Sequence, residues 1–474
     1  MGPDHLKFGG GVTETVLNPA VLILVLIAGV LICVWPRKKA IVAFLAASIL
    51  VPMDQVLLIG PAHFPMLRLL VLFGIIRMVR EMRSSKRRIF AGGINKIDIA
   101  FILFTLVTAA NGVLLFQESG AAVYQLGVIY TSFGVYFLLR SLIRDEQDVI
   151  RTIQTFAGIS IIIAAIMIYE RISGHNPYAL LGGANAAAYA NLMARDDKFR
   201  AIGCFSHPIL AGTFGAILVP LFIGLWWKAK KYRAIAVVGI LSSTVMTITC
   251  NSSTPVLGYA AGVLALCLWP LRRRMRLVRW GILLTVISLH LVMKAPVWHL
   301  IARIDVTGGS SSWHRFMLVD QCIRHFGDWW LVGVKDTSAW GWDMWDTANE
   351  YVGTCENSGL IPFLLLLAIL IYGFKYLGRA RRALAKDKKK ALFIWALGAA
   401  LFANVVAFLG ISYFDQTIVA WYGLLALISA TVALPRTQEA GMALPLRQSW
   451  NSVIASPQLV PASVGERTAS EEIF

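Results

Sequence analysis

Long apolar runs alternate with short polar connections along most of this chain. A run of roughly 18 or more apolar residues is long enough to cross a bilayer as an α-helix. By this criterion the sequence predicts an all-α polytopic membrane protein with about 13 transmembrane helices (12–14). The predicted spans are residues 17–35, 40–59, 64–79, 98–116, 121–142, 151–169, 205–227, 234–250, 254–270, 279–294, 359–377, 391–410 and 414–434.

Basic clusters fall in every second connection between the predicted spans. Cytoplasmic loops carry an excess of Lys and Arg, so these connections are expected to face the cytoplasm. The N-terminus then lies outside and the C-terminus inside. Two long connections, 170–204 and 295–358, share the extracytoplasmic face and can therefore meet. The basic clusters are Arg37–Lys39, Arg77–Lys96, Arg140–Arg151, Lys228–Arg233, Arg272–Arg279 and Lys375–Lys390.

Composition agrees with a membrane protein. Of the 474 residues 57% are hydrophobic and 15% are charged, against about 25% charged in soluble domains. The net charge of +18 does not indicate nucleic-acid binding, because topology explains the basic clusters. Residues 1–434 are expected to form the transmembrane domain. Residues 435–474, rich in Pro, Ser, Gln and Glu, are expected to be a disordered cytoplasmic tail.

The connection 295–358 is too polar to cross a bilayer and too aromatic to be a flexible linker. A Gly/Ser turn, Gly308–Ser312, precedes residues with helical apolar spacing. This spacing predicts a helix over 313–326 that lies across the mouth of the bundle. Its predicted buried face consists of Phe316, Val319, Ile323 and Phe326.

His314 and Arg315 fall in the first turn of this predicted helix, after the N-cap candidate Ser312. Cations there oppose the helix dipole, but a Gly/Ser turn with free N–H groups and an Arg suits a diphosphate. Alternatively, the helix lies on the membrane and Arg315 contacts lipid headgroups. Spacing alone favours neither interpretation.

Trp residues recur through the same connection, and they too have two interpretations. An interfacial aromatic belt explains one or two of them. The others would be platforms for sugar rings, and Trp313 and Trp342 are the candidate substrate-binding residues. The five that fall within 17 residues are Trp329, Trp330, Trp340, Trp342 and Trp345.

Arg200, His207 and the cysteines are the remaining residues whose side chains could take part in binding or catalysis. Arg200, which ends the other long connection, is either a snorkelling cation or a second anion contact facing Arg315. His207, before a proline, is expected to fix the start of a helix. The six cysteines form no CxxC motif, and no metal or cofactor site is expected. Cys322 and Cys355 either pair in an oxidising compartment or are two free thiols.

Three segments carry a resemblance to a known family. RAIGCFSHP (200–208) is similar to an Arg-x-x-Gly-x-Phe-x-x-Pro segment before a helix. Arg303 and Arg315 precede a helix that ends in RHFGDWWLVGV (324–334). In ANEYVGTCENSGLIP (348–362), Asn349 and Gly359 match, but the family His falls on Ala348. Together they resemble the bacterial O-antigen ligase and O-antigen polymerase family, which includes exopolysaccharide polymerases.

The resemblance implies a glycosyltransferase in the bacterial inner membrane. Its donor would be a glycan on undecaprenyl diphosphate, and neither metal nor other cofactor is implied. The acceptor hydroxyl would belong to another glycan, as in a polymerase, or to lipid A core, as in a ligase. Ala348 favours a polymerase or a divergent relative. The implied partners are the lipid-linked glycan, the bilayer, a flippase and a chain-length regulator.

In this interpretation the arginines bind the diphosphate leaving group and stabilise its charge. The candidates are Arg315, Arg200 and Arg303, with His314 beside them. Displacement at the anomeric carbon would invert its configuration.

The acceptor hydroxyl would need a general base. Asp346, Glu350 and Glu356 are the nearby carboxylates, and Glu356 is favoured because many family members have an acidic residue there. Asn349 would orient a sugar or the loop itself.

Two other classes compete with this interpretation. A flippase for the same lipid would require charged residues at bilayer depth, and the predicted spans contain few. A non-catalytic membrane subunit of an exopolysaccharide machine is compatible with Ala348.

Overall fold

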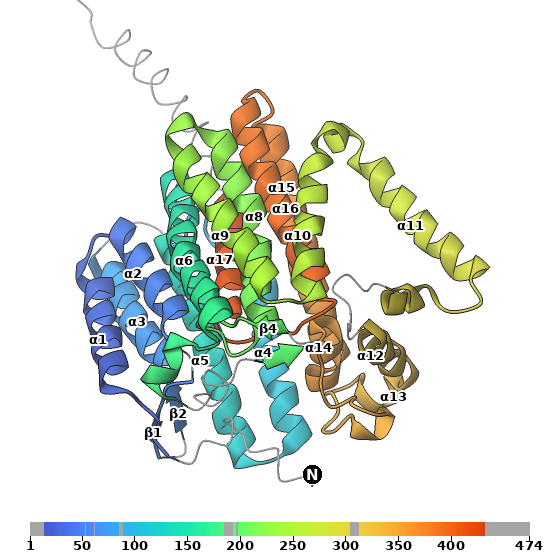
Figure 1. Ribbon diagram of the computed structural model, residues 1–474, viewed down its shortest axis with the longest axis horizontal. Coiled ribbons are helices and arrows are strands. Elements are labelled where there is room, and N and C mark those ends of the chain that lie inside the picture. The colour runs from blue at the N-terminus through green and yellow to red at the C-terminus, as the bar shows by residue number, and fades with distance from the viewer. Residues whose placement is uncertain are drawn as a thin grey trace, which may run out of the picture.

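The computed structural model is predominantly α-helical (Figure 1). It describes residues 14–52, 54–60, 62–84, 89–183, 193–195, 198–303 and 312–431. The predicted tail 435–474 and most of the Gly/Ser turn, residues 308–311, lie outside the described residues.

Each predicted span overlaps one helix. These helices are α1 (Pro19–Val34), α2 (Arg37–Leu50), α3 (Met66–Ser84), α4 (Lys96–Phe116), α5 (Ser119–Leu142), α6 (Glu146–Ser173), α8 (Pro208–Lys228), α9 (Arg233–Thr249), α10 (Ser253–Cys267), α11 (Met275–Val292), α15 (Leu360–Ala383), α16 (Lys388–Ala407) and α17 (Gln416–Thr431). In the described part of the chain, eight apolar helices are long enough to cross a membrane. The chain is therefore a multi-pass membrane protein, while the count of thirteen spans stays a prediction.

The predicted span 40–59 is wrong in its second half. α2 ends at Leu50, and the chain then forms β1 (Val56–Ile59), which pairs with β2 (Ala62–Pro65) in an antiparallel hairpin. Pro52 explains the early end, because proline lacks an N–H group and disfavours helical backbone in the residue before it. A second short hairpin joins β3 (Met193–Arg195) to β4 (Lys198–Arg200).

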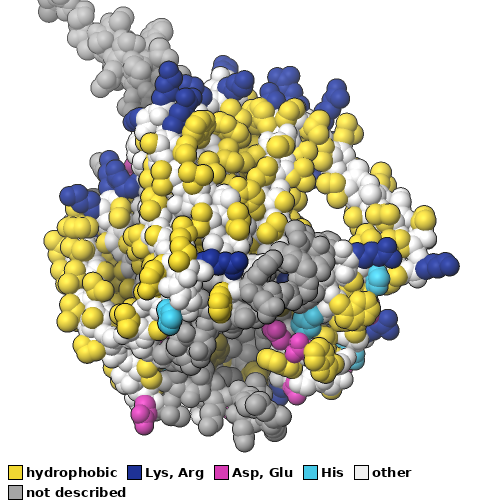
Figure 2. Space-filling model, viewed as in Figure 1, with side chains coloured by type: hydrophobic (Ala, Val, Ile, Leu, Met, Phe, Trp, Pro, Cys, Tyr) yellow, Lys and Arg dark blue, Asp and Glu magenta, His cyan; other side chains and the backbone are white. Residues whose placement is uncertain are grey.

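Connections that carry basic clusters meet at one end of the bundle. Arg37, the first residue of α2, pairs with Asp148 in the first turn of α6 at 2.8 Å. Lys228, at the end of α8, pairs with Glu146 of the same turn. Figure 2 shows many Lys and Arg side chains gathered at the upper end of the molecule.

The other set of connections meets at the opposite end. Gln416, at the start of α17, donates its amide to the Cys204 carbonyl at 2.8 Å. Asn111, near the end of α4, donates to the Ser358 carbonyl at 2.6 Å. Thr254 donates to the Gly410 carbonyl at 3.2 Å. The connections 170–204 and 295–358 therefore end on the same side of the bundle.

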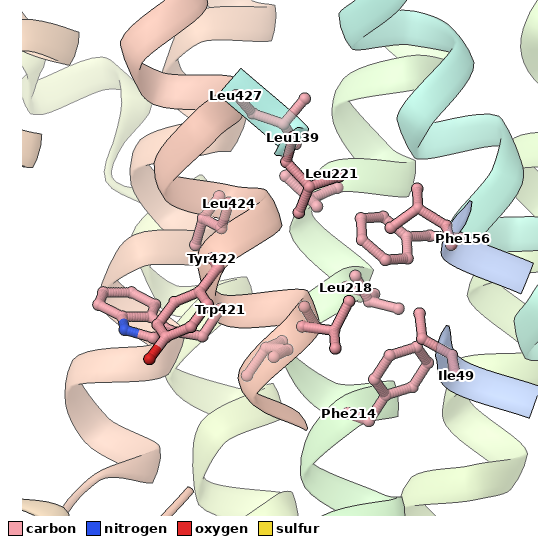
Figure 3. Close-up of a cluster of buried hydrophobic side chains, with 14 of the residues drawn as sticks. Ile49, Leu139, Phe156, Phe214, Leu218, Leu221, Trp421, Tyr422, Leu424 and Leu427 are labelled. Atoms are coloured by element: carbon pink, nitrogen blue, oxygen red, sulfur yellow. The ribbon is translucent and has the colours of Figure 1, made fainter. Parts of the chain in front are cut away.

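The main core surrounds α8, whose apolar stretch is 89% buried against 61% or less for the other long apolar helices. Phe214 and Leu218 of α8 point toward Phe156 of α6 and Ile49 of α2 (Figure 3). The rings of Phe156 and Phe214 lie 6.2 Å apart, edge to face. We call these side chains, with Tyr422 of α17, the bundle core.

α11 differs from the other helices because it stands away from the bundle (Figure 1). None of its 18 residues is buried. An apolar helix without buried residues needs an apolar solvent, so the exposure of α11 agrees with a position in lipid.

The connection 295–358 is folded in its described residues, 295–303 and 312–358. Its elements are η5 (Val297–Arg303), α12 (Ser312–Arg324), α13 (Phe326–Trp329), η6 (Ser338–Trp340) and α14 (Glu350–Ser358). They enclose a small hydrophobic cluster, which we call the loop core. Its buried members are Leu318, Cys322, Trp329, Trp340, Met344, Val352 and Cys355.

The predicted helix over 313–326 is confirmed by α12. Its predicted buried face is wrong for two of its four residues. Phe316 is buried, whereas Ile323 and Phe326 are 50% and 46% exposed. The stripe that packs on the loop core contains Leu318 and Cys322. Apolar spacing alone missed this stripe because the buried Arg315, which lies on the same face of α12, is polar. α12 also ends at Arg324, so Phe326 belongs to the next helix.

Candidate functional site

Asn349 begins α14. Its side-chain oxygen accepts the N–H groups of Tyr351 and Val352 at 3.0 and 3.1 Å. Its amide donates to the Leu409 carbonyl at the end of α16, at 3.2 Å. Asn349 is fully buried. Of its two predicted roles, the structure supports orientation of the loop.

Glu356 lies on α14 and is 3% exposed. The Thr347 hydroxyl donates to Oε2 at 2.6 Å. Within the described part of the chain, Oε1 has no hydrogen-bond partner. Burial raises the pKa of Glu356 to about 7, and the Thr347 hydrogen bond opposes this shift. A carboxyl group with this pKa and one free oxygen can accept a proton near neutral pH.

Glu350, at the start of the same helix, is half-buried and accepts the backbone N–H of Tyr413 at 2.7 Å. Burial raises its pKa to about 7 as well. The hydrogen bond ties α14 to the connection between α16 and α17. Ser412 adds a second tie, because its hydroxyl donates to the Thr347 carbonyl at 2.8 Å. Glu350 therefore has a positioning role that the sequence did not indicate.

The same connection reaches the segment before α8. The Ser206 hydroxyl donates to the Asp415 carboxylate. Burial raises the pKa of Asp415; the Ser206 hydrogen bond opposes this, and the nearby Asp54 raises the pKa further. Asp415 also has a left-handed backbone, with φ of 51°. Such backbone in a non-glycine residue is uncommon and is often found at functional sites.

His207 follows Ser206 in the chain, and Arg200 lies close to His207. Arg200 is buried, and its Nε donates to the Cys250 carbonyl at 3.2 Å. Burial and the charge of Arg200 lower the pKa of His207 to about 4, so its ring is neutral at pH 7. His207 Nδ1 accepts the N–H of Ile209 at 3.2 Å and caps α8. The predicted structural role of His207 is confirmed.

Arg315 is buried in the first turn of α12, with 6% of its surface exposed. Next to it, His314 Nε2 lies 2.9 Å from the carbonyl oxygen of Asp346. Burial raises the pKa of the Asp346 carboxyl, and His314 opposes this shift. Because Asp346 precedes Thr347, the start of α12 adjoins the segment that binds Glu356. These two contacts place His314, Asp346 and Glu356 along one path, and Arg315 follows His314 in the chain.

Other predicted site residues lie on the surface. Arg303 ends η5 and is exposed. Trp313 is 59% exposed and packs its ring on His299 and Phe316. Trp342 is 91% exposed. The predicted pair of facing arginines, Arg200 and Arg315, stays a prediction.

Three residues of this site were missed by sequence reasoning. Asp54, Ser206 and Asp415 come from three separate connections, and two of those connections are short. No motif links them, and only the tertiary fold brings them together. The sequence offered one signal for these residues: each is a polar Asp or Ser next to the end of a predominantly apolar helix.

Comparisons with known proteins add no assignment. No family model matches the chain, and no curated protein matches it in sequence. Among the described residues, no group of three or more His, Cys, Asp or Glu side chains could hold a metal ion.

Proposed function

We propose that this protein transfers or polymerises glycan repeats carried on undecaprenyl diphosphate, at the extracytoplasmic face of the bacterial inner membrane. The single observation that carries the proposal is Glu356. A buried carboxyl with pKa about 7 and one oxygen without a partner in the described part of the chain is suited to general-base catalysis. It lies in a folded loop in which Arg303, Arg315 and Asn349, with the adjoining Gly359, resemble positions of the ligase and polymerase family.

Glu356 would take the proton from the acceptor hydroxyl as that oxygen attacks the anomeric carbon. The bond to the lipid diphosphate breaks in the same step, and the diphosphate leaves with the electron pair. Arg315 would stabilise the charge that develops on this leaving group. Glu350 and Asn349 would hold α14 against the ends of α16 and α17, so that Glu356 keeps its position.

Buried arginines also explain why the donor is a diphosphate in this proposal. A guanidinium group stays charged when buried and grips phosphate oxygens through two parallel hydrogen bonds. Arg200 and Arg315 are both buried at the same end of the bundle. The exposed Trp342 would stack on a sugar of the growing chain.

Thirteen spans with the N-terminus outside and the C-terminus in the cytoplasm complete the proposal. Cysteine labelling tests the orientation at two exposed positions in a cysteine-free background. Ala339→Cys, in the loop, should react with an impermeant maleimide from outside, and Lys388→Cys only after the membrane is opened. Reaction of both positions from one side would contradict the topology.

The decisive experiment is turnover of a lipid-diphosphate glycan by the purified protein in lipid vesicles. Longer glycans and free undecaprenyl diphosphate should appear together, and Glu356→Gln should slow the formation of both by about 10²-fold or more. With lipid A core as the only acceptor, transfer would favour the O-antigen ligase alternative. No turnover of any lipid-linked glycan would favour a non-catalytic subunit.

The flippase alternative has one observation in its favour. Arg140 and Asp98 form a fully buried ion pair at 3.0 Å between α5 and α4. Asp98, however, closes a capping box with Asn95 at the first turn of α4. Its position at a helix end suits a structural clamp better than a transport pathway at bilayer depth.

A further inference from the structure

The six cysteines of the chain are all described, and none is bonded to another in this structure. Two of them, Cys322 and Cys355, nevertheless both belong to the loop core, and their side chains interact there. Each is 5% exposed. A hydrogen bond to Cys355, together with burial, raises the pKa of the Cys322 thiol. The two thiols belong to different helices, α12 and α14, and neighbouring cysteines of this kind can be bridged when their Cα atoms lie within disulfide range.

The other four cysteines have different surroundings. Cys33, Cys204 and Cys250 donate to the carbonyls of different backbone segments, at 3.1–3.3 Å. Cys267 is exposed at the end of α10. Cys204 and Cys250 are buried near the same end of the bundle as the loop, and they supply a matched control.

The two cysteines lie on the same helices as the two main candidate site residues, Arg315 and Glu356. Cys322 lies seven residues after Arg315 on α12, which is two helical turns and therefore the same face. Cys355 directly precedes Glu356 on α14. A covalent bond between them would fix the helix that carries Arg315 against the helix that carries Glu356.

The loop core is also small. Seven buried hydrophobic residues enclose it. Small extracytoplasmic units with little core are commonly stabilised by disulfides, because a crosslink restricts the unfolded chain.

We propose that Cys322 and Cys355 form an intramolecular disulfide that staples α12 to α14. The proposal rests on the extracytoplasmic location of the loop in the proposed function. One cysteine thiolate attacks the disulfide of an extracytoplasmic thiol–disulfide oxidant and forms a mixed disulfide. The second thiolate then displaces the oxidant's sulfur. The two thiol protons pass to the oxidant, whose disulfide is reduced to a dithiol.

The order of events follows from burial. Buried thiols with a raised pKa are poor nucleophiles. The bond therefore forms before α12 packs on α14, and afterwards the loop core protects it from reduction.

Thiol counting tests the proposal on the full chain in membranes. Free thiols are blocked with N-ethylmaleimide in denaturant, the sample is reduced, and the new thiols are labelled with a polyethylene-glycol maleimide. Two labels per chain are expected for the unmodified protein and for Cys204→Ser/Cys250→Ser. No label is expected for Cys322→Ala or Cys355→Ala, and non-reducing gels should show a monomer.

Absence of label in the unmodified protein would overturn the proposal, as would a crosslinked dimer. Labelling of Ala339→Cys from outside then tells whether the pair or the location was wrong. Thiol counting needs no substrate, so its failure is distinguishable from failure of the proposed glycosyl transfer. If the alanine variants do not accumulate, mass spectrometry of the Cys322–Cys355 crosslinked peptide in the unmodified protein decides the question.

Discussion

The bundle core and the loop core differ in the side chains that are buried in and around them. Around α8 the packed side chains are apolar, as Phe156, Phe214 and Leu218 illustrate (Figure 3). Beside the loop core, α12 and α14 bury Arg315 and Glu356. Burying ionisable groups costs stability, and such groups concentrate where chemistry needs a perturbed pKa. The difference indicates that the bundle positions the site and the loop supplies its chemistry.

The two cores are joined at the end of α16. The Glu350 N–H donates to the Phe408 carbonyl at 2.9 Å, and the Tyr351 hydroxyl donates to the Val405 carbonyl at 2.9 Å. Glu356 lies two turns further along the same helix. Rigid attachment of α14 is what a positioned base requires, because catalysis depends on orientation. Substitutions should therefore separate into those that change protein level and those that change activity.

The largest effect is expected at Arg315. Arg315→Ala and Arg315→Lys should both abolish polymer formation while the protein stays in the membrane at normal level. Loss of one donor to a developing anion costs about 10²-fold or more in rate. Lysine keeps the charge but lacks the planar fork that binds two phosphate oxygens. Polymer gels of membranes with matched protein levels measure this.

Arg324→Ala is the matched control for Arg315, because Arg324 lies on the same helix with its side chain 67% exposed. It should keep normal activity. Full activity of Arg315→Lys would favour the headgroup-contact interpretation of this arginine. Full activity of Arg315→Ala would remove the residue from the site.

Glu356→Gln should lower kcat by about 10²–10⁴, the usual contribution of a general base. A base works only when deprotonated, and burial raises the pKa of Glu356 to about 7. Activity of the unmodified protein should therefore rise with pH, pass half its maximum near 7 and level off above it. Residual activity of Glu356→Gln should lack this rise. Initial rates in vesicles between pH 5.5 and 8.5 measure both.

Glu350→Gln tells whether Glu350 or Glu356 is the general base, since the pKa values of both carboxyl groups are about 7. A glutamine oxygen can still accept the Tyr413 N–H, so the positioning role survives. We expect this variant to keep the pH profile and most of the activity. The opposite result, a flat profile in Glu350→Gln, would assign the base to Glu350.

The sequence predicted the helices of the bundle well and the site only in part. Apolar runs and basic clusters indicate spans and sides because lipid and topology act on them directly. Arg315, Asp346 and Glu356 could be predicted because they share one polar connection. Asp415 and Ser206 could not, since only tertiary folding joins them. The capping role of Asn349 depends on where α14 begins, and a sequence pattern locates helix ends poorly.

In the bundle core, a substitution should act on protein level. Phe214→Ala removes a fully buried ring beside Phe156 and leaves a cavity. Such changes cost about 3–5 kcal/mol in soluble proteins. We expect several-fold less protein in the membrane, with near-normal activity per molecule. Leu241→Ala, at a 60% exposed position on α9, is the control and should change neither. Normal level with lost activity in Phe214→Ala would contradict the division between the two cores.

The smallest effect is expected at Trp342, which is 91% exposed and so contributes little to the loop core. If its ring stacks on a sugar of the acceptor, Trp342→Ala should raise KM about fivefold, equivalent to about 1 kcal/mol of binding. The value of kcat should stay the same, because stacking away from the reacting atoms stabilises substrate and transition state equally. Trp342→Tyr should restore most of the affinity. The buried Trp340 gives the contrast, since Trp340→Ala should destabilise the loop core and lower activity at all acceptor concentrations. An unchanged KM in Trp342→Ala, with weaker retention of the protein in membranes, would assign Trp342 to an interfacial aromatic belt and leave the acceptor site without this platform.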